Sequence, residues 1–252
     1  MEPSRTLNYK MKSMFKICPK IEKQCAFCGE SNWNPMTDSK SDNIFGGNFP
    51  SITIKDMVKA QKYLIDALLI KKLFAVIGGS MGAMQALQWS IDYPEKIKNI
   101  IHIAGALKHS AQNIAFHEVG RQAIMNDDNW NKGNYISKNL IPERGLAVAR
   151  MIAHITYLSD DAMHRKFGRK LQSRDIISFG FEADFQIESY LRYQGRSFVD
   201  RFDANSYLYL TRAMDYFDTV KTFSSSIEFP SIPNHHINYL IIAFTSDWLF
   251  PT

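Results

Sequence analysis

Residues 73–87, LFAVIGGSMGAMQAL, decide the predicted fold. The first five, Leu73–Ile77, are all apolar, which is typical of a short strand buried in a parallel sheet. Glycines then flank Ser80 in the pattern G-x-S-x-G, and the small and apolar residues from Ala83 to Ile91 favour a helix. The stretch therefore predicts a strand, a tight turn and a helix, with one serine at the turn.

The chain on either side of this stretch extends the pattern. Upstream, Thr53 is a good helix N-cap and Asp56 follows three residues later, the spacing of a capping box. Downstream, Ile97–Ala104 is a second apolar run and predicts another strand. Strand, helix and strand in this order form a βαβ unit, so we expect a parallel sheet that is covered on both faces.

The next run typical of a strand is YLIIAF, residues 239–244. About 130 residues separate it from the second strand, whereas one crossover needs roughly 10–30. The interval contains helical patterns and predicts an insertion above the carboxyl edge of the sheet; the clearest patterns are Leu146–Leu158, Ala183–Tyr193 and Ala204–Phe217. The predicted domains are an irregular segment (1–33), the first part of an α/β core (34–108), a helical lid insertion (109–225) and the second part of the core (226–252).

The turn at Ser80 has the composition that a nucleophilic serine requires. Such a serine projects from a sharp bend, and Gly78 and Gly82 would let the strand and the helix approach closely. The backbone N–H of Met81, at the start of the helix, would then point toward the developing oxyanion. The alternative is a glycine turn whose serine only caps the helix. The setting between an apolar strand and a small-residue helix favours the nucleophile.

Asp247 is the candidate acid of a catalytic triad. It follows the third predicted strand at the carboxyl edge of the sheet, where catalytic groups of α/β proteins gather. A triad acid orients a histidine and stabilises its imidazolium, and in folds with this serine turn the chain order is serine, acid, histidine. Taken alone, an aspartate at a strand end is more often a turn or cap residue.

The histidine of such a triad has no candidate after Asp247, because all seven histidines precede that residue. His102 lies within a strand, where we expect a core histidine with satisfied hydrogen bonds. The others fall in the insertion, where packing or surface roles are expected, or in the loop before the third strand; they are His109, His117, His154, His164, His235 and His236.

Composition excludes several classes of function. The net charge is +5, but residues 1–24 carry six basic and two acidic residues, so only +1 remains on the other 228 residues and nucleic acid is not an expected partner. No apolar run reaches the ~18 residues of a membrane helix, and no secretory signal is evident. The three cysteines, Cys18, Cys25 and Cys28, suit a reducing cytoplasm. Cys25 and Cys28 lack a second ligand pair, so no metal is expected.

Several longer stretches resemble one family, the homoserine O-acetyltransferases of the α/β-hydrolase fold. The resemblance runs from about Asn34 to Pro251, and the matching stretches are NPMT, FPSITIKDMVKAQ, AVIGGSMGAMQALQW, SAQNIAFHEVGRQAI, RGLAVARMIAHITYLSD, FGRKLQ, YLRYQGRSFVDRFDANSYLYLTRAMDYFD and FTSDWLFP. The resemblance implies an α/β-hydrolase core with a helical lid, a cytoplasmic homodimer and a role in methionine biosynthesis.

The resemblance also implies a chemistry. Ser80 would take the acetyl group from acetyl-CoA, and the γ-hydroxyl of L-homoserine would attack the acyl-enzyme in a ping-pong transfer; acetyl-CoA is a co-substrate, and no bound cofactor is expected. Asp247 would be the triad acid, and Arg150 and Tyr157 would bind homoserine. Relatives that use succinyl-CoA carry arginine where this chain has Leu249, so acetyl is favoured, although succinyl- or serine-specific relatives stay open.

Two departures from the family pattern qualify these expectations. Residues 1–33 are too few and too unlike the family to supply its N-terminal strands and second oxyanion donor, and the closing Gly-His-Asp segment would lie beyond Thr252. We therefore expect a chain truncated at both ends with little turnover, because losing the triad base costs on the order of a millionfold in kcat. The alternatives are a noncatalytic remnant and a plain serine hydrolase.

Overall fold

The structure is a computed structural model that describes residues 44–172, 176–219 and 237–250. The predictions for residues 1–33, for Cys18, Cys25 and Cys28, and for His235 and His236 lie outside these residues. Contacts between Cα atoms divide the described chain into two compact units. The sheet unit comprises 44–45, 50–108, 216–219 and 237–242, and the helical unit comprises 46–49, 109–172, 176–215 and 243–250.

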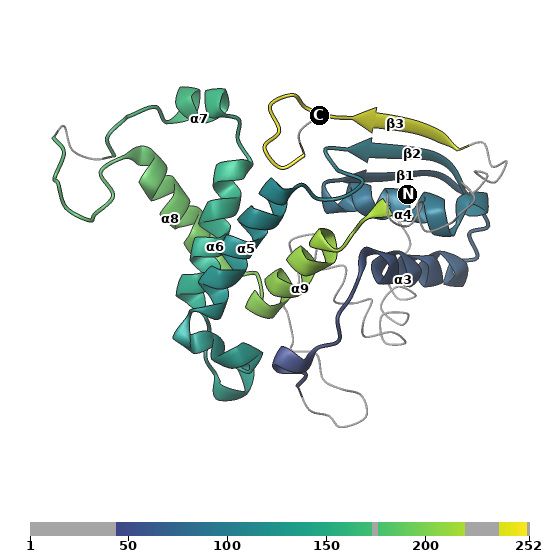
Figure 1. Cartoon of the computed structure of the whole chain (residues 1–252), viewed down its shortest axis with the longest axis horizontal. Helices are drawn as coiled ribbons and strands as arrows, with labels where there is room; N and C mark the ends of the chain where they lie inside the picture. Colours follow the sequence, from purple (N-terminus) through teal and green to yellow (C-terminus); the bar gives the residue numbers. More distant parts are fainter. Residues whose placement is uncertain (1–43, 173–175, 220–236, 251–252) are drawn as a thin grey trace, which may run out of the picture. The chain divides into compact units, whose positions relative to one another are not determined.

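The sheet unit contains three parallel strands in the order β1-β2-β3, namely β1 (Leu73–Gly79), β2 (Ile97–Ile103) and β3 (Asn238–Ile242) (Figure 1). Each predicted strand is therefore confirmed, and so is the parallel arrangement. β1 extends two residues beyond the apolar run because Gly78 and Gly79 keep the ladder with His102 and Ile103.

Two helices lie on one side of this sheet, α3 (Ile54–Ala67) and α4 (Met81–Asp92), and the 3-10 turn η3 (Pro94–Lys96) precedes β2 (Figure 1). α3 begins at the predicted capping box, because the side chain of Thr53 accepts from the amide of Asp56 and the carboxylate of Asp56 accepts from the amide of Thr53. The core between helices and sheet consists of Val58, Ala86, Trp89, Ile97 and Ile100.

The opposite face of the sheet differs from the prediction that both faces are covered. Ile77, Ile101 and Leu240 lie in register across the three strands on that face. The side chains of Ile77 and Leu240 are 63% and 53% exposed. Within the described residues of the sheet unit, α3 and α4 lie on the other face, so no helix of this unit covers the apolar row.

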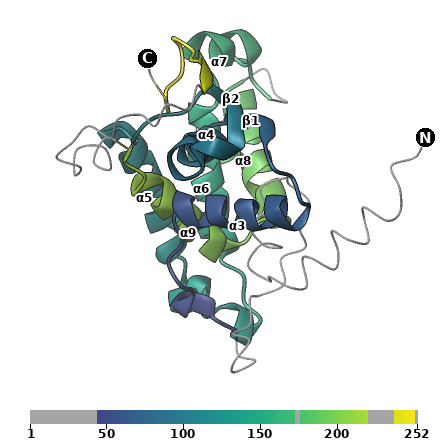
Figure 2. The ribbon, with the colours of Figure 1, turned by 90° about the vertical axis from the view of Figure 1, so that its right-hand side faces the viewer.

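The helical unit is built around α5 (Ala111–Met125), α6 (Glu143–Thr156) and α8 (Gln186–Val199), which lie side by side in Figures 1 and 2. Its core gathers Ile124, Tyr135, Leu146, Ala149, Phe198 and Ala204. Gly145 lets α6 approach α5, since a Cβ there would lie 2.4 Å from the carbonyl oxygen of Ala123. The shorter elements are α7 (Asp160–Lys166), α9 (Ala204–Asp215), η2 (Gly46–Asn48), η4 (Asp128–Gly133) and η5 (Ile136–Lys138).

The insertion is helical as predicted, but its elements differ in their ends. The pattern at Ala183–Tyr193 becomes α8, which begins at Gln186 and ends at Val199, and α5 was not among the predicted helices. Residues 243–250, predicted as part of the core, fall in the helical unit: the side-chain amide of Gln112 donates to the carbonyl of Trp248, and the rings of His109 and Phe250 lie 5.8 Å apart. None of the described helices combines the length and apolar character that a membrane span requires.

Candidate active site

Ser80 occupies a strained bend between β1 and α4. Its backbone angles are φ 55° and ψ −121°, a left-handed conformation that costs about 1–3 kcal/mol for a residue with a side chain. The amide of Ser80 donates to the carbonyl oxygens of Ile103 (3.0 Å) and Ala104 (3.1 Å), which fixes the bend against the end of β2. Ser80 is exposed and its side chain does not cap α4, so the reading as a mere helix cap is not supported.

The two glycines that flank the serine have different roles. A Cβ on Gly78 would lie 2.0 Å from the carbonyl oxygen of Gly82 and 2.8 Å from the amide of Ala83, so only glycine fits. A Cβ on Gly82 would meet no described atom within 4 Å. The expectation that close approach requires both glycines is therefore confirmed for Gly78 and wrong for Gly82, because the backbone of Gly82 faces β1 while a side chain there would point into open space.

This contrast gives a matched pair of variants. Gly78→Ala should lower the free energy of unfolding by about 1–3 kcal/mol, because the added methyl group overlaps backbone that cannot move aside cheaply. Gly82→Ala should leave stability unchanged or raise it by up to about 1 kcal/mol, because alanine is the better helix former. Urea denaturation of both variants measures the difference, and equal effects in the two would contradict the geometry.

The oxyanion donor predicted at Met81 has suitable backbone surroundings. Met81 is the first residue of α4, and the first amides of a helix have no acceptor within the helix. The carbonyl of Ser80 accepts from the amides of Ala83 (2.9 Å) and Met84 (3.3 Å), so the helix begins directly after the serine. The amide of Met81 is thus next to the nucleophile at a positive helix end, and its catalytic role remains a prediction.

Asp247 is held in a turn. One carboxylate oxygen, Oδ1, accepts from the amides of Leu249 (2.8 Å) and Phe250 (2.9 Å), and the amide of Asp247 donates to the carbonyl of Phe244 (3.1 Å). The turn role that the sequence left open is therefore present. These bonds use Oδ1 and fix the orientation of the carboxyl group. Ser80 and Asp247 belong to different units, and their pairing in a triad remains a prediction.

Arg150 and Tyr157 lie on the same face of α6, as their spacing of seven residues predicts. The guanidinium carbon of Arg150 lies 5.4 Å from the ring centre of Tyr157 and 4.5 Å from that of Phe198. None of the acidic residues in the described ranges forms a salt bridge with Arg150. The arginine is thus stacked on aromatic rings without a neutralising carboxylate, which suits a residue that binds an anionic group.

His102 is a core residue, but the expectation of satisfied hydrogen bonds is wrong. It is buried on β2, and neither ring nitrogen has a hydrogen-bond partner among the described residues. A Cβ on Gly105 would lie 2.9 Å from its Nε2, so the ring is closely packed. Burial lowers the pKa of His102 below its ordinary value, because the charged form is poorly solvated at this position.

The lowered pKa makes a pH-dependent prediction. Below pH ~6.5 this histidine is protonated in the unfolded chain but still neutral in the folded chain. The free energy of unfolding therefore decreases as the pH is lowered from ~6.5, until the pH reaches the pKa of the folded state. This loss amounts to at most about 1.4 kcal/mol per pH unit, and His102→Leu should not show it. Urea denaturation at pH 7 and pH 5.5 tests this, with His164→Leu on the exposed side of α7 as control; an unchanged pH dependence in His102→Leu would contradict the prediction.

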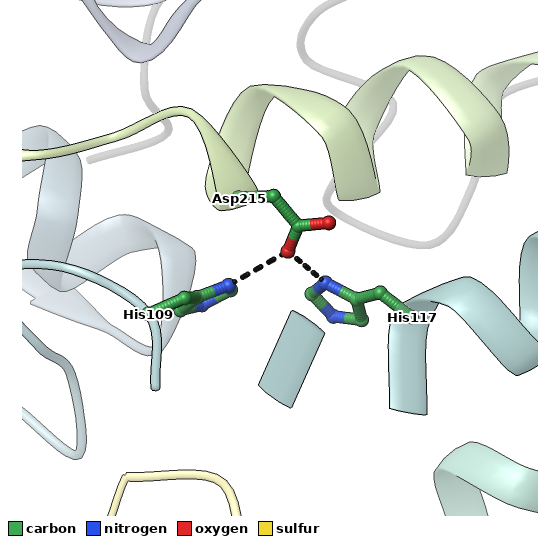
Figure 3. Close-up of side chains that lie close together, drawn as sticks. All are labelled: His109, His117 and Asp215. Atoms are coloured by element: carbon green, nitrogen blue, oxygen red, sulfur yellow. Dashed lines mark hydrogen bonds and ion pairs between the residues drawn. The ribbon is translucent and has the colours of Figure 1, made fainter. Parts of the chain in front are cut away.

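A buried polar cluster in the helical unit was not predicted from the sequence (Figure 3). Asp215 on α9 accepts through Oδ1 from Nδ1 of His109 (3.0 Å) and Nδ1 of His117 (2.7 Å), and through Oδ2 from Nη1 of Arg121 (2.7 Å). Burial alone would raise the pKa of the Asp215 carboxyl, but the hydrogen bonds from His109, His117 and Arg121 hold it well below the ordinary value.

Two imidazoles and a carboxylate could in principle hold a divalent cation, since their ligand atoms lie within 4.8 Å of one another. Here both imidazoles turn Nδ1 to the same carboxylate oxygen, and the buried guanidinium of Arg121 already neutralises that carboxylate. A cation would have to displace both N–H groups beside a fixed positive charge. We therefore interpret the cluster as a set of hydrogen bonds that joins α5 to α9.

Comparison with known proteins places the chain in a class. The family model described as alpha/beta hydrolase fold matches residues 27–252, so the chain belongs to the α/β-hydrolase fold family. The bend at Ser80, between a parallel strand and a helix, agrees with that assignment.

Within this class the similarity points to one group. The chain is 56% identical over 239 residues to the homoserine O-acetyltransferase of Rhodopseudomonas palustris (strain HaA2), covering 94% of this chain and 58% of that protein. The predicted resemblance is thereby confirmed, and the chain spans less than two thirds of that relative's length.

Solved structures show the same fold. A homoserine O-acetyltransferase from Bacillus anthracis aligns with a TM-score of 0.77 at 24% identity, over 90% of this chain and 60% of that one. Esterase E22 aligns with a TM-score of 0.69 at 26% identity, over 87% of this chain and 68% of that one.

Proposed function

We propose that this chain carries the nucleophile of an acyltransferase that moves an acetyl group from acetyl-CoA to the γ-hydroxyl of L-homoserine. The observation that carries the proposal is the exposed Ser80 on its strained bend, in a chain 56% identical to a homoserine O-acetyltransferase. The homoserine O-acetyltransferase likeness favours acyl transfer over hydrolysis, and the stacked, unneutralised Arg150 suits an amino-acid carboxylate.

The proposed reaction has two steps. Ser80 Oγ attacks the thioester carbonyl, its proton passes to a base, and the CoA thiol leaves with a proton; the negative charge on the carbonyl oxygen is met by the amide of Met81. The γ-hydroxyl of homoserine then attacks the acetyl ester, which releases O-acetylhomoserine and restores the serine. Asp247 would orient the imidazole that serves as base and stabilise its protonated form.

The 252 residues contain no histidine after Asp247, where chain order in this fold places the base, so the experiments follow the acylation of Ser80 as well as turnover. Leu249 supports acetyl as the acyl group, because its amide serves the Asp247 turn and its side chain offers no charge to a succinyl carboxylate.

The proposal also covers the pathway, the cellular compartment and the oligomeric state. We propose that it serves methionine biosynthesis in the cytoplasm, as the family resemblance implies. We also propose a homodimer through the helical unit. Val148 and Ile155 support this, because they are exposed apolar residues seven positions apart on α6, the spacing of a helix-packing stripe.

A plain serine esterase is the second candidate, and the likeness to esterase E22 favours it. Labelled acetyl-CoA distinguishes the two. Acyl transfer predicts O-acetylhomoserine as the main labelled product when L-homoserine is present, whereas an esterase releases labelled acetate at the same rate with or without homoserine. A noncatalytic remnant would give neither product and no labelled protein. The assay uses the 252-residue chain, and the identity of the labelled product decides between the candidates whatever its rate of formation.

A further inference from the structure

The face of α6 that carries Arg150 holds a second polar side chain, His154. Residues four apart on a helix are neighbours, and the His154 ring lies 5.4 Å from that of Tyr157, which also contacts Arg150. Within the described chain, two nitrogens on this face are buried without a hydrogen-bond partner: Nε of Arg150 and Nε2 of His154. We call them the α6 donor pair.

The contacts of the His154 ring bear on which of its nitrogens carries the hydrogen. Nδ1 lies 3.2 Å from the hydroxyl of Tyr190, whose ring lies under the ammonium group of Lys166 at 4.6 Å. Burial, followed by the charges of Arg150, Arg201 and Lys166, lowers the pKa of His154 to about 4, so the imidazole is neutral at pH 7 and carries one hydrogen. When the Tyr190 hydroxyl donates to Nδ1, that hydrogen is on Nε2.

With the Tyr190 hydroxyl as donor to Nδ1, the α6 donor pair presents two N–H groups one helical turn apart, neither with an acceptor in the described chain. An unsatisfied buried donor costs about 1–3 kcal/mol, and the cations around this face make an anionic acceptor the favourable partner. A carboxylate has two oxygens and can accept from both donors. The ring of Tyr157 contacts both side chains and is 53% exposed, so the pair lies next to an aromatic ring at the surface of the helical unit.

We propose that His154 is a further substrate-binding residue, which donates from Nε2 to the carboxylate of the amino-acid substrate beside Arg150. This inference rests on the proposed function for the identity of the substrate. It gives His154 a role in selecting substrates with a carboxylate, and no part in the acylation of Ser80.

Calorimetric titration of the 252-residue chain with L-homoserine tests the proposal. The control ligand is 3-aminopropan-1-ol, which has the same amine and hydroxyl groups but no carboxylate. We expect His154→Phe to bind homoserine at least tenfold more weakly, the loss of one hydrogen bond to a charged group, and to bind the control ligand as before. His154→Gln, whose amide can donate from a similar position, should recover most of the affinity.

A second measurement needs no variant. The ¹⁵N shifts of the His154 ring should show the Nε2–H tautomer, and Nε2 should shift when homoserine is added. The Nδ1–H tautomer, equal homoserine affinity in His154→Phe, or no preference of the wild-type chain for homoserine over the control ligand would each overturn the proposal. Intact-mass detection of acetylated Ser80 in the wild-type chain separates the hypotheses: acetylation without a His154 effect refutes this site alone, and a His154 effect without acetylation refutes the acyltransferase function alone.

Discussion

Ser80→Ala is expected to abolish acetylation of the protein by acetyl-CoA. Ser80 is exposed on a left-handed bend fixed by two hydrogen bonds, the geometry of a nucleophile at the end of a parallel strand. Where a complete triad operates, loss of the serine costs on the order of a millionfold in kcat. Effects within a triad are not additive, so the decisive quantity is the covalent acetyl group on the protein and not turnover.

Intact-mass spectrometry after incubation with acetyl-CoA measures this result. The wild-type chain should gain the mass of one acetyl group, and peptide mapping should place it on residue 80. Ser90→Ala is the matched control, because Ser90 lies on the same helix and its hydroxyl only donates to the carbonyl of Leu87. Acetylation that persists in Ser80→Ala, or that disappears in Ser90→Ala, would contradict the assignment of the nucleophile.

Among the variants proposed for stability measurements, Asp215→Asn is expected to lower the free energy of unfolding the most. The substitution removes the charge that neutralises Arg121, whose side chain is 2% exposed, and it can turn an amide N–H toward the guanidinium donors. Breaking a buried ion pair on one side costs about 3–5 kcal/mol, a large fraction of the total stability of about 5–15 kcal/mol. Thermal and urea denaturation should both show the loss.

Glu118→Gln is the matched control for that experiment. Glu118 also pairs with Arg121, but its side chain is 42% exposed, so its loss should cost no more than about 1 kcal/mol. The pH dependence gives a further check. Because the folded pKa of Asp215 is lowered, its contribution to stability is present above pH ~4 and is lost as the pH falls through the folded pKa; Asp215→Asn should lack this acid-dependent component. Equal losses in the two variants would show that the charge of Asp215 is not decisive.

Much of the sheet unit could be predicted from the sequence because its signals are local. The apolar run before Ser80, the glycine pattern and the capping box at Thr53 each specify an element within a few residues, and the structure confirms all three. The ends of the helices were less predictable. α8 continues past Tyr193 because its later residues, including Phe198, pack into the core of the helical unit, a contact that local patterns do not reveal.

The features of the candidate site also fall into two groups, those that local sequence predicts and those that depend on packing. The sequence alone predicted the bend at Ser80, since its neighbours specify it, and it predicted that Arg150 and Tyr157 lie close together, since helical spacing fixes this. The role of Ser80 as nucleophile stays a prediction. Only the tertiary structure decided that Gly78 is required and Gly82 is not, that His102 has no partner, and that Asp215 joins His109, His117 and Arg121. The difference between the two glycines depends on the path of the backbone through the turn, which the pattern G-x-S-x-G does not specify. The properties of His102 and Asp215 depend on which atoms surround them in the folded chain and on their burial, and spacing along one element carries no information about either.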